Sequence, residues 1–185
     1  MKQSFRQTLK LVAEDLGWRC AYEHKAPGKL VFLKMLANPG ALCVACYRWQ
    51  VFFDSHRLTP LGWLMRLFSL VGFAVSIDSR AEIAGGLVII HANSIYISEG
   101  VRIGPQCILF HQNWIGRSPF PQGDAAQARQ GPTIGARAIF GAGACAAGPI
   151  TIGDDCKIGV NAAVETSFPD GAVAFGVPAR QVAKT

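Results

Sequence analysis

The chain has 185 residues, half of them hydrophobic and only 16% charged, which excludes a disordered protein and is apolar for a soluble monomer. One domain with a small appendage fits this length, and burial in an oligomer would account for the apolar composition. The formal net charge of +6 favours acidic partners such as a phosphorylated cofactor, whereas the lack of Lys/Arg runs with interleaved aromatic residues argues against nucleic acid.

Residues 1–75 are predicted to form an N-terminal helical region. Residues 2–16 place apolar side chains on one stripe and polar side chains elsewhere, which is typical of an amphipathic helix. The stripe consists of Phe5, Leu9, Val12 and Leu16. Residues 17–30 contain glycine and proline and are interpreted as a connection. Two further helices are expected, at 30–36 before an Asn-Pro-Gly turn, and at 41–55.

The six cysteines lack the spacing of a small disulfide scaffold, and no secretory signal segment is evident, so we expect a reducing, cytoplasmic location. Cys43 and Cys46 have the spacing of a redox or zinc pair, but no second pair completes a zinc site. We interpret both as helix packing residues. Cys107 and Cys156 are expected in the core.

The segment from Leu61 to Val75 is strongly apolar around a single Arg66, yet it is shorter than the roughly 20 residues needed to span a bilayer. With Arg57 nearby, it could rest on a membrane surface as a peripheral contact. It could also pack against another subunit or against the structure that follows it. We favour packing.

From Ile77 to Phe168 an aliphatic or small apolar residue returns every six positions, with a two-residue slip before Ile97 and a break after Gly116. A period of six with turns between short strands is typical of a parallel β-helix, in which stacking of the coils buries the repeated column. The lead positions are Ile77, Ile83, Ile89, Ile97, Ile103, Leu109, Ile115, Ile134, Phe140, Ala146, Ile152, Ile158 and Val164. Small or aliphatic residues four positions after most leads predict a second inward column.

The break in the repeat covers residues 117–132, which have no six-residue phase and are rich in proline, glycine and glutamine. We expect this segment to leave the coil as a protruding loop. The β-helical part of the chain is therefore predicted to span residues 76–185, with an insertion.

Three motifs carry a resemblance to the hexapeptide acyltransferases, and within them to the serine acetyltransferase branch. They are Gly85–His91, Phe140–Ala144 and Phe175–Arg180, supported by the Tyr47-Arg48 pair in the preceding helix. The resemblance implies a mainly β fold, a left-handed parallel β-helix with three hexads per coil. It also implies acyl transfer from acetyl-CoA or another acyl-CoA to the hydroxyl of a small acceptor. It further implies a homotrimer with sites between subunits, which the helices could pair into a hexamer.

His91 and His111 each lie two residues after a lead position, and they are separated by one eighteen-residue coil plus the slip. We therefore expect them to stack on one face, about 4.8 Å apart. Such a pair could bind a metal, act together in catalysis, or combine one base with a polar neighbour. The resemblance puts His91 at the position of the catalytic histidine, as general base. Metal is disfavoured, because metal-binding relatives of this fold use three histidines and the repeat holds no third.

For the donor, the resemblance implies that coenzyme A lies in a groove between neighbouring barrels, held by the backbone of small residues and by basic side chains at its phosphates. The residues concerned are Gly141, Ala142, Gly143, Ala144, Ala146, Ala147, Arg180 and Lys184. Ordinary packing of the coils would explain the same small residues equally well.

For the acceptor, the sequence departs from the family. Ser76 stands where a carboxylate normally orients the histidine, and Ile90 stands where an aspartate helps to bind serine. Gly131, next to Gln130, stands where a second histidine is usual. Asp78 could substitute for the carboxylate. The acceptor therefore stays open between serine, a sugar hydroxyl of a polysaccharide and another alcohol, and a catalytically silent trimeric scaffold is the alternative.

His111 occupies a position where serine acetyltransferases tend to carry glutamine. We predict that it lines the acceptor pocket beside His91, either hydrogen-bonding the acceptor or disfavouring protonation of His91 by like-charge repulsion.

Overall fold

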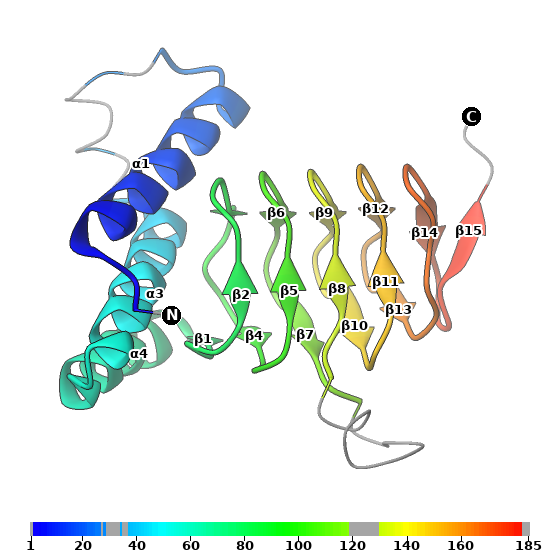
Figure 1. Ribbon diagram of the computed structural model, residues 1–185. Helices are drawn as coiled ribbons and strands as arrows, with labels where there is room; N and C mark the ends of the chain where they lie inside the picture. The colour runs from blue at the N-terminus through cyan, green and yellow to red at the C-terminus, as the bar shows by residue number, and fades with distance from the viewer. Residues whose placement is uncertain (1, 27, 29–33, 35–36, 119–129, 183–185) are drawn as a thin grey trace.

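The computed structural model describes residues 2–26, 28, 34, 37–118 and 130–182. A layer of helices covers one end of a prism built from short strands, and the C-terminal strands lie at the other end (Figure 1). The predicted mainly β fold with an N-terminal helical segment is confirmed.

The described helices are α1 (Phe5–Tyr22), α3 (Pro39–Ser55) and α4 (Thr59–Phe73). Side-chain caps fix two of their starts, because the Ser4 hydroxyl accepts from the Gln7 N–H and the Asn38 carboxamide oxygen accepts from the Gly40 N–H. The helix expected at 41–55 is thus confirmed with a slightly earlier start. The helix expected at 30–36 falls almost entirely outside the described residues.

One expectation for the first helix is wrong and another is confirmed only in part. The helix passes through Gly17 instead of ending there, because Arg19 and Cys20 are buried against the rest of the fold. The apolar stripe packs only at its C-terminal half, since Leu16 is buried with Val12 against it, whereas Phe5 and Leu9 are both about half exposed. The face that packs includes polar Asp15 and Arg19, whose charged groups find partners across the interface.

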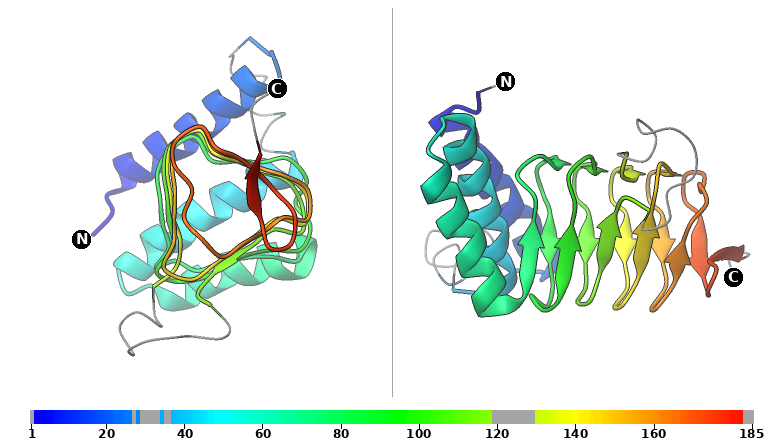
Figure 2. Two further views of the ribbon diagram at one scale, coloured as in Figure 1. Left: turned by 90° about the vertical axis from the view of Figure 1, so that its right-hand side faces the viewer. Right: turned by 90° about the horizontal axis from the view of Figure 1, so that it is seen from below.

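The strands form three sheets, one on each side of a triangular prism (Figure 2). Sheet 1 consists of β1 (Val75–Ile77), β4 (Ile95–Ile97), β7 (Trp114–Gly116), β10 (Cys145–Ala147) and β13 (Ala163–Val164). Sheet 2 consists of β2 (Glu82–Ile83), β5 (Arg102–Ile103), β8 (Thr133–Ile134) and β11 (Thr151–Ile152). Sheet 3 consists of β3 (Val88–Ile89), β6 (Ile108–Leu109), β9 (Ile139–Phe140), β12 (Lys157–Ile158), β14 (Val173–Phe175) and β15 (Arg180–Val182).

Every pairing is parallel except that of β14 with β15. In sheet 1, Ser76 pairs with Tyr96, Tyr96 with Trp114, and Trp114 with Cys145. The longer sequence steps at the first and last of these pairs absorb the two-residue slip and the insertion. The coils therefore stay in register although the hexad count changes.

The barrel core is the repeat itself. All thirteen lead positions are buried, and so is the predicted second column, which includes Leu87, Val101 and Ala138. The core interpretation of Cys107 and Cys156 and the packing interpretation of Cys43 and Cys46 are confirmed, because all four side chains are buried.

Buried polar side chains join the helices to the backbone of the first coil. Arg48 makes a bidentate ion pair with Asp15 and donates to the carbonyl oxygens of Ile83 and Ala84 at 2.6 Å each. Asp15 in turn accepts from two backbone N–H groups of the turn before β3. Burial raises the pKa of Asp15, against the opposing effect of Arg48. The helical layer and the barrel consequently share one continuous interface.

α4 packs on one side against α3 and β1, as favoured for the apolar segment, through a face that contains Gly62 and Ser69. Its other side is exposed. No helix among the described residues has the length and apolar character needed to cross a membrane.

Candidate active site

The two repeat histidines lie at the corner where sheet 3 passes into sheet 1. Because Ile89 pairs with Leu109, His91 two residues later lies over His111 of the next coil. Their ring centroids are 5.7 Å apart and the ring planes are inclined at 66°. The predicted placement of the two histidines on one face of successive coils is confirmed, and their rings meet edge to face.

The surroundings of the two rings differ. His91 is exposed, and among the described residues its ring contacts are with His111 and with Phe110, at 6.4 Å. His111 is half-buried, and its Nδ1 is buried without a hydrogen-bond partner within the described part of the chain. A ring nitrogen of the exposed His91 can exchange a proton with the hydroxyl of a bound molecule, and the neighbouring His111 still has unused hydrogen-bonding capacity.

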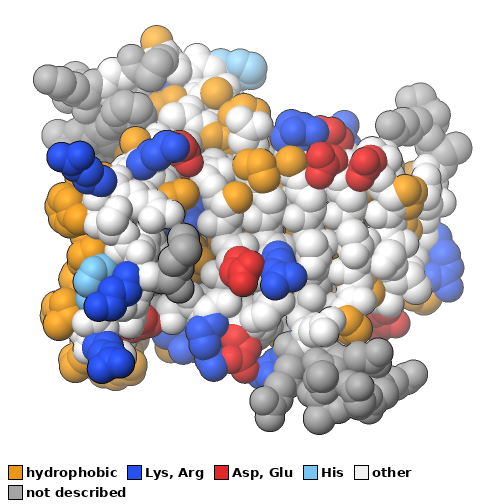
Figure 3. All heavy atoms as spheres, in the orientation of Figure 1, with side chains coloured by type: hydrophobic (Ala, Val, Ile, Leu, Met, Phe, Trp, Pro, Cys, Tyr) orange, Lys and Arg blue, Asp and Glu red, His pale blue; other side chains and the backbone are white. Residues whose placement is uncertain are grey.

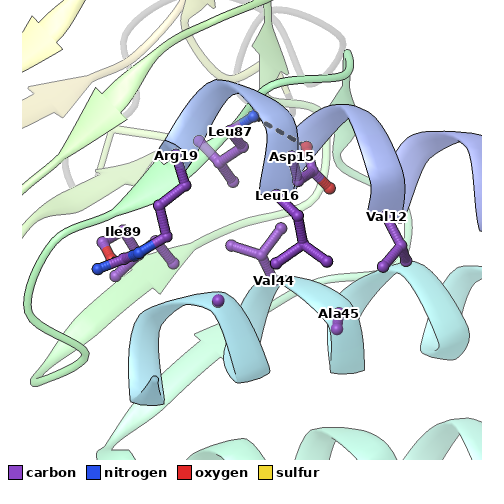
Figure 4. A pocket seen from close by; sticks show the side chains of 9 residues that line it. Val12, Asp15, Leu16, Arg19, Val44, Ala45, Leu87 and Ile89 are labelled. Carbon is purple, nitrogen blue, oxygen red and sulfur yellow. Dashed lines mark hydrogen bonds between the residues drawn. The ribbon is translucent and has the colours of Figure 1, made fainter. Parts of the chain in front are cut away.

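Arg19 of α1 holds the strand that carries His91. Its guanidinium donates to the Ile89 carbonyl at 2.7 Å, in the contact that Figure 4 shows from close by. Gly40 of α3 touches the same carbonyl, so closely that a Cβ there would overlap it. The cavity between Leu16, Val44 and Ile89 measures only about 10 Å³, which leaves no room for a substrate. This region therefore supports the site and does not belong to it.

Above His111 lies the glycine-rich coil. The register continues from Leu109 to Phe140, so Ala142 follows His91 and His111 in one column. The Gly143 N–H donates to the His111 carbonyl at 2.9 Å, from a residue with φ +71°. The buried Asn113 carboxamide donates to the Gly141 carbonyl at 2.7 Å and to the Ala144 carbonyl at 3.2 Å. Asn113, which sequence reasoning missed, thus fixes the turn over the histidine corner.

The residues expected to hold the donor have different surroundings. Ala144 and Ala146 are fully buried in the barrel core, so only their backbone could meet a ligand. A Cβ at Gly141 would collide with the backbone of the next coil, and Gly143 has a positive φ, so the geometry of the coil by itself favours glycine at both positions. Ala142 and Ala147 are half-buried on the outside of the coil.

The two basic residues lie at the far end of the chain. Arg180 is exposed on β15, and Lys184 lies outside the described residues.

A groove of about 690 Å³ runs over the outer surface of sheet 1 beside the glycine-rich coil. Trp114 and Cys145, which pair in register, form part of its floor, and Ser118, Ala147 and Glu165 lie along it. Only Ala147 was among the residues predicted from the sequence. Sequence position could have identified the other groove residues, because Trp114 and Cys145 each follow the column of His91, His111 and Ala142 by three residues within their coil.

The predicted acceptor residues do not lie at the corner of the prism that holds the two histidines. Ser76 is in β1, where its hydroxyl accepts from the Arg66 guanidinium at 3.1 and 3.3 Å. Gln130 is exposed and Gly131 packs on Val101 of the coil below, both at the corner where sheet 1 passes into sheet 2.

Asp78 begins that same corner, and its carboxylate binds Arg80. Burial opposes ionisation of Asp78, but the hydrogen bonds and charge of Arg80 outweigh it and lower the pKa of Asp78. Arg80 also contacts Glu99, which pairs with Arg117 at 3.0 Å. Asp78 is therefore committed to this ion-pair chain and makes no hydrogen bond with a histidine in the described part of the chain.

Sheet 1 separates the two groups of predicted site residues. His91, His111 and Ala142 lie at its entry, whereas Asp78 and Gly131 lie at its exit. One chain alone does not bring them together.

Within the described ranges, no group of three or more His, Cys, Asp or Glu side chains could hold a metal ion.

Known proteins with similar sequences are serine acetyltransferases, although no family model matches the chain. The chain is 31% identical to that of Helicobacter pylori over 150 residues, covering 81% of this chain and 85% of the relative. It is 35% identical to that of Mycobacterium tuberculosis over 159 residues, covering 80% of this chain and 67% of the relative.

Solved structures agree. The Neisseria gonorrhoeae serine acetyltransferase in complex with serine matches 97% of this chain and 71% of its own with a TM-score of 0.81 and 26% identity. The soybean enzyme complexed with serine gives a TM-score of 0.80 at 27% identity, over 95% of this chain and 69% of its own.

Proposed function

The chain belongs to the serine acetyltransferase family of hexapeptide-repeat acyltransferases, and from this premise we propose that His91 is the general base of its acetyl transfer. The donor is acetyl-CoA and the acceptor is the hydroxyl of a small molecule. The observation that carries the proposal is the exposed His91 ring, which lies edge to face against His111 at the corner beside the glycine-rich coil.

The reaction needs one proton shuttle. His91 takes the proton of the acceptor hydroxyl as the hydroxyl oxygen bonds to the thioester carbonyl carbon. The carbon–sulfur bond then breaks, and His91 returns the proton to the departing thiolate. The products are an acetyl ester and free CoA.

His111 acts on the acceptor side of this pair. Its buried, unpartnered Nδ1 leaves the other ring nitrogen as the group that can meet an acceptor oxygen. The stacked arrangement supports this role, because a group bound by His111 would lie next to His91. His111 would then take the place of the hydrogen-bonding residues that the family carries elsewhere.

The groove over sheet 1 fits an extended donor. Ala147, one of the residues expected at the donor, lines it, and its floor has small side chains and an indole. The pantetheine arm would lie along this floor, with the thioester at the histidine corner. Arg180 and Lys184 remain the residues proposed to bind the phosphates of coenzyme A.

The working unit in this proposal is a homotrimer with a site at each contact between barrels. Its support is the separation within one chain of the histidine corner from the corner that holds Asp78 and Gly131. Side-by-side packing of prisms would bring one corner of each type together. A sedimentation equilibrium mass of three times the 19.8 kDa chain is the expected result.

The direct test is turnover. Wild-type protein is incubated with acetyl-CoA and a panel of hydroxyl acceptors while thiol release is followed. Serine heads the panel because relatives were solved with serine bound, and sugars and simple alcohols complete it. Thiol release that depends on one acceptor class supports the proposal. If no acceptor gives turnover and CoA does not bind, the chain is a silent scaffold.

A further inference from the structure

We infer that the exposed face of α4 is a docking surface for an anionic membrane. This surface, here called the α4 face, consists of Leu61, Trp63, Leu64, Phe68, Leu70 and Val71. It lies outside the acetyl-transfer site and does not depend on the proposed function.

The α4 face is continuous and uncharged. At 100° per residue, its six side chains fill the half of the helix opposite Gly62 and Ser69, the two positions buried against α3 and β1. Trp63 is 62% exposed and Val71 77% exposed. Such a run of large apolar side chains exceeds the isolated exposed residues found on ordinary surfaces.

Charged groups near α4 avoid this face. Arg66, the only charged residue of the helix, turns toward Ser76 of the barrel. Asp54, the last acidic residue before the helix, lies over Gly62 on the packed side. Arg57 lies immediately before the helix and is exposed. The pattern of Trp, Phe and Leu on one face with a basic flank is typical of helices that lie in a membrane interface.

The whole net charge of the protein lies in this part of the chain. Residues 1–74 contain ten Lys and Arg against four Asp and Glu, a net charge of +6, whereas residues 75–185 contain eight of each and are neutral. Figure 3 shows Lys and Arg together with hydrophobic side chains over the helical end, while most of the visible Asp and Glu lie over the barrel.

This distribution decides between two occupants of the α4 face. A second copy of the chain, docked through the same face, would bring two segments of charge +6 against each other, which opposes association. An anionic lipid surface instead attracts each basic residue while the apolar side chains enter the headgroup region. The charge therefore favours lipid over self-association.

Docking in this way would also orient the barrel. α1 and α3 contact β3, the strand that leads to His91, so the candidate site belongs to the coil nearest the helical layer. A membrane at the helical end would have this coil closest to it and the C-terminal strands farthest away (Figure 1).

The test is flotation of the full-length protein with phosphatidylcholine vesicles and with phosphatidylcholine vesicles containing phosphatidylglycerol. We expect binding to the anionic vesicles at least about tenfold stronger than to the neutral ones, decreasing with added salt. The double variant Leu64→Glu with Val71→Glu should lose at least about tenfold of this binding. Val177→Glu is the matched control, since Val177 is 76% exposed at the other end of the barrel, and it should bind as wild type does.

Three results would overturn the inference. They are no flotation of wild type with anionic vesicles at low salt, equal flotation of the double variant, and sedimentation of the double variant as a smaller assembly than wild type. The last would mean that a second copy covers the face. Thermal melts by circular dichroism check that the variant folds, and if it does not, serine replaces glutamate at both positions under the same expectation.

Discussion

His91 and His111 lie edge to face at one corner of the first two coils with their ring centroids 5.7 Å apart, and neither ring nitrogen of His91 is occupied by a hydrogen bond in the described part of the chain. If His91 is the base, His91→Ala should lower turnover about 100- to 10,000-fold while leaving CoA binding intact. Thiol release measures the first quantity and calorimetric titration with CoA the second. His56→Ala, at the end of α3 and away from the barrel, should keep wild-type turnover.

His111→Gln tests the paired role. Loss of one hydrogen bond to the acceptor should raise the acceptor KM about fivefold, with little change in CoA affinity. The measurement is steady-state kinetics with the best acceptor of the panel. Wild-type behaviour with every acceptor would leave His91 acting alone.

Asn113→Ala should loosen the glycine-rich turn over the histidine corner. The substitution removes both donors to the Gly141 and Ala144 carbonyls, so we expect a loss of about 1–3 kcal/mol in the free energy of unfolding and weaker CoA binding. Urea denaturation and CoA titration measure the two effects. Asn93 lies four residues after Ile89, as Asn113 lies four residues after Leu109, but the register aligns Ile95 with Asn113. Asn93 is exposed, and Asn93→Ala should change little. Equal effects of both substitutions would contradict this role.

Asp15→Ala should destabilise the protein strongly, because it leaves the buried Arg48 guanidinium without its bidentate partner. Breaking such a pair costs about 3–5 kcal/mol. Urea denaturation followed by circular dichroism gives the value. The control is Arg102→Gln, which breaks the exposed pair with Glu82 and should cost less than about 1 kcal/mol. A similar small loss for Asp15→Ala would show that the helices do not depend on this contact.

Native thiol labelling should separate the cysteines by environment. Burial raises the pKa of Cys43 and of Cys107 to about 11, so at pH 8 both are almost entirely protonated and unreactive. Cys145 is half-buried on the groove floor and should be alkylated first by iodoacetamide. Mass spectrometry of the digested protein locates the label, and Cys145→Ala should remove the fast phase. Protection of Cys145 by CoA would support the groove as the donor site, whereas fast labelling of Cys43 would contradict its burial.

The sequence alone determined the β-helix and the histidine pair. A six-residue period encodes which side chains face inward on every coil, so the core from Ile77 to Val164 and the stacking of His91 on His111 follow from counting positions. The same counting predicted the buried Cys107 and Cys156. These features are local and repeat, which is why periodicity is sufficient to find them.

Only the tertiary structure decided what surrounds the pair. The Arg19 contact with the Ile89 carbonyl joins residues 70 apart in the sequence, and the Asn113 contact with Gly141 spans the insertion. The structure also shows that Asp78 pairs with Arg80 and that Gly131 lies at the other edge of sheet 1. Within one chain, neither residue is therefore at the corner that holds the two histidines. Periodicity describes which way a side chain faces but not which polar group meets it, because buried polar groups are satisfied by partners from distant segments that carry no repeat.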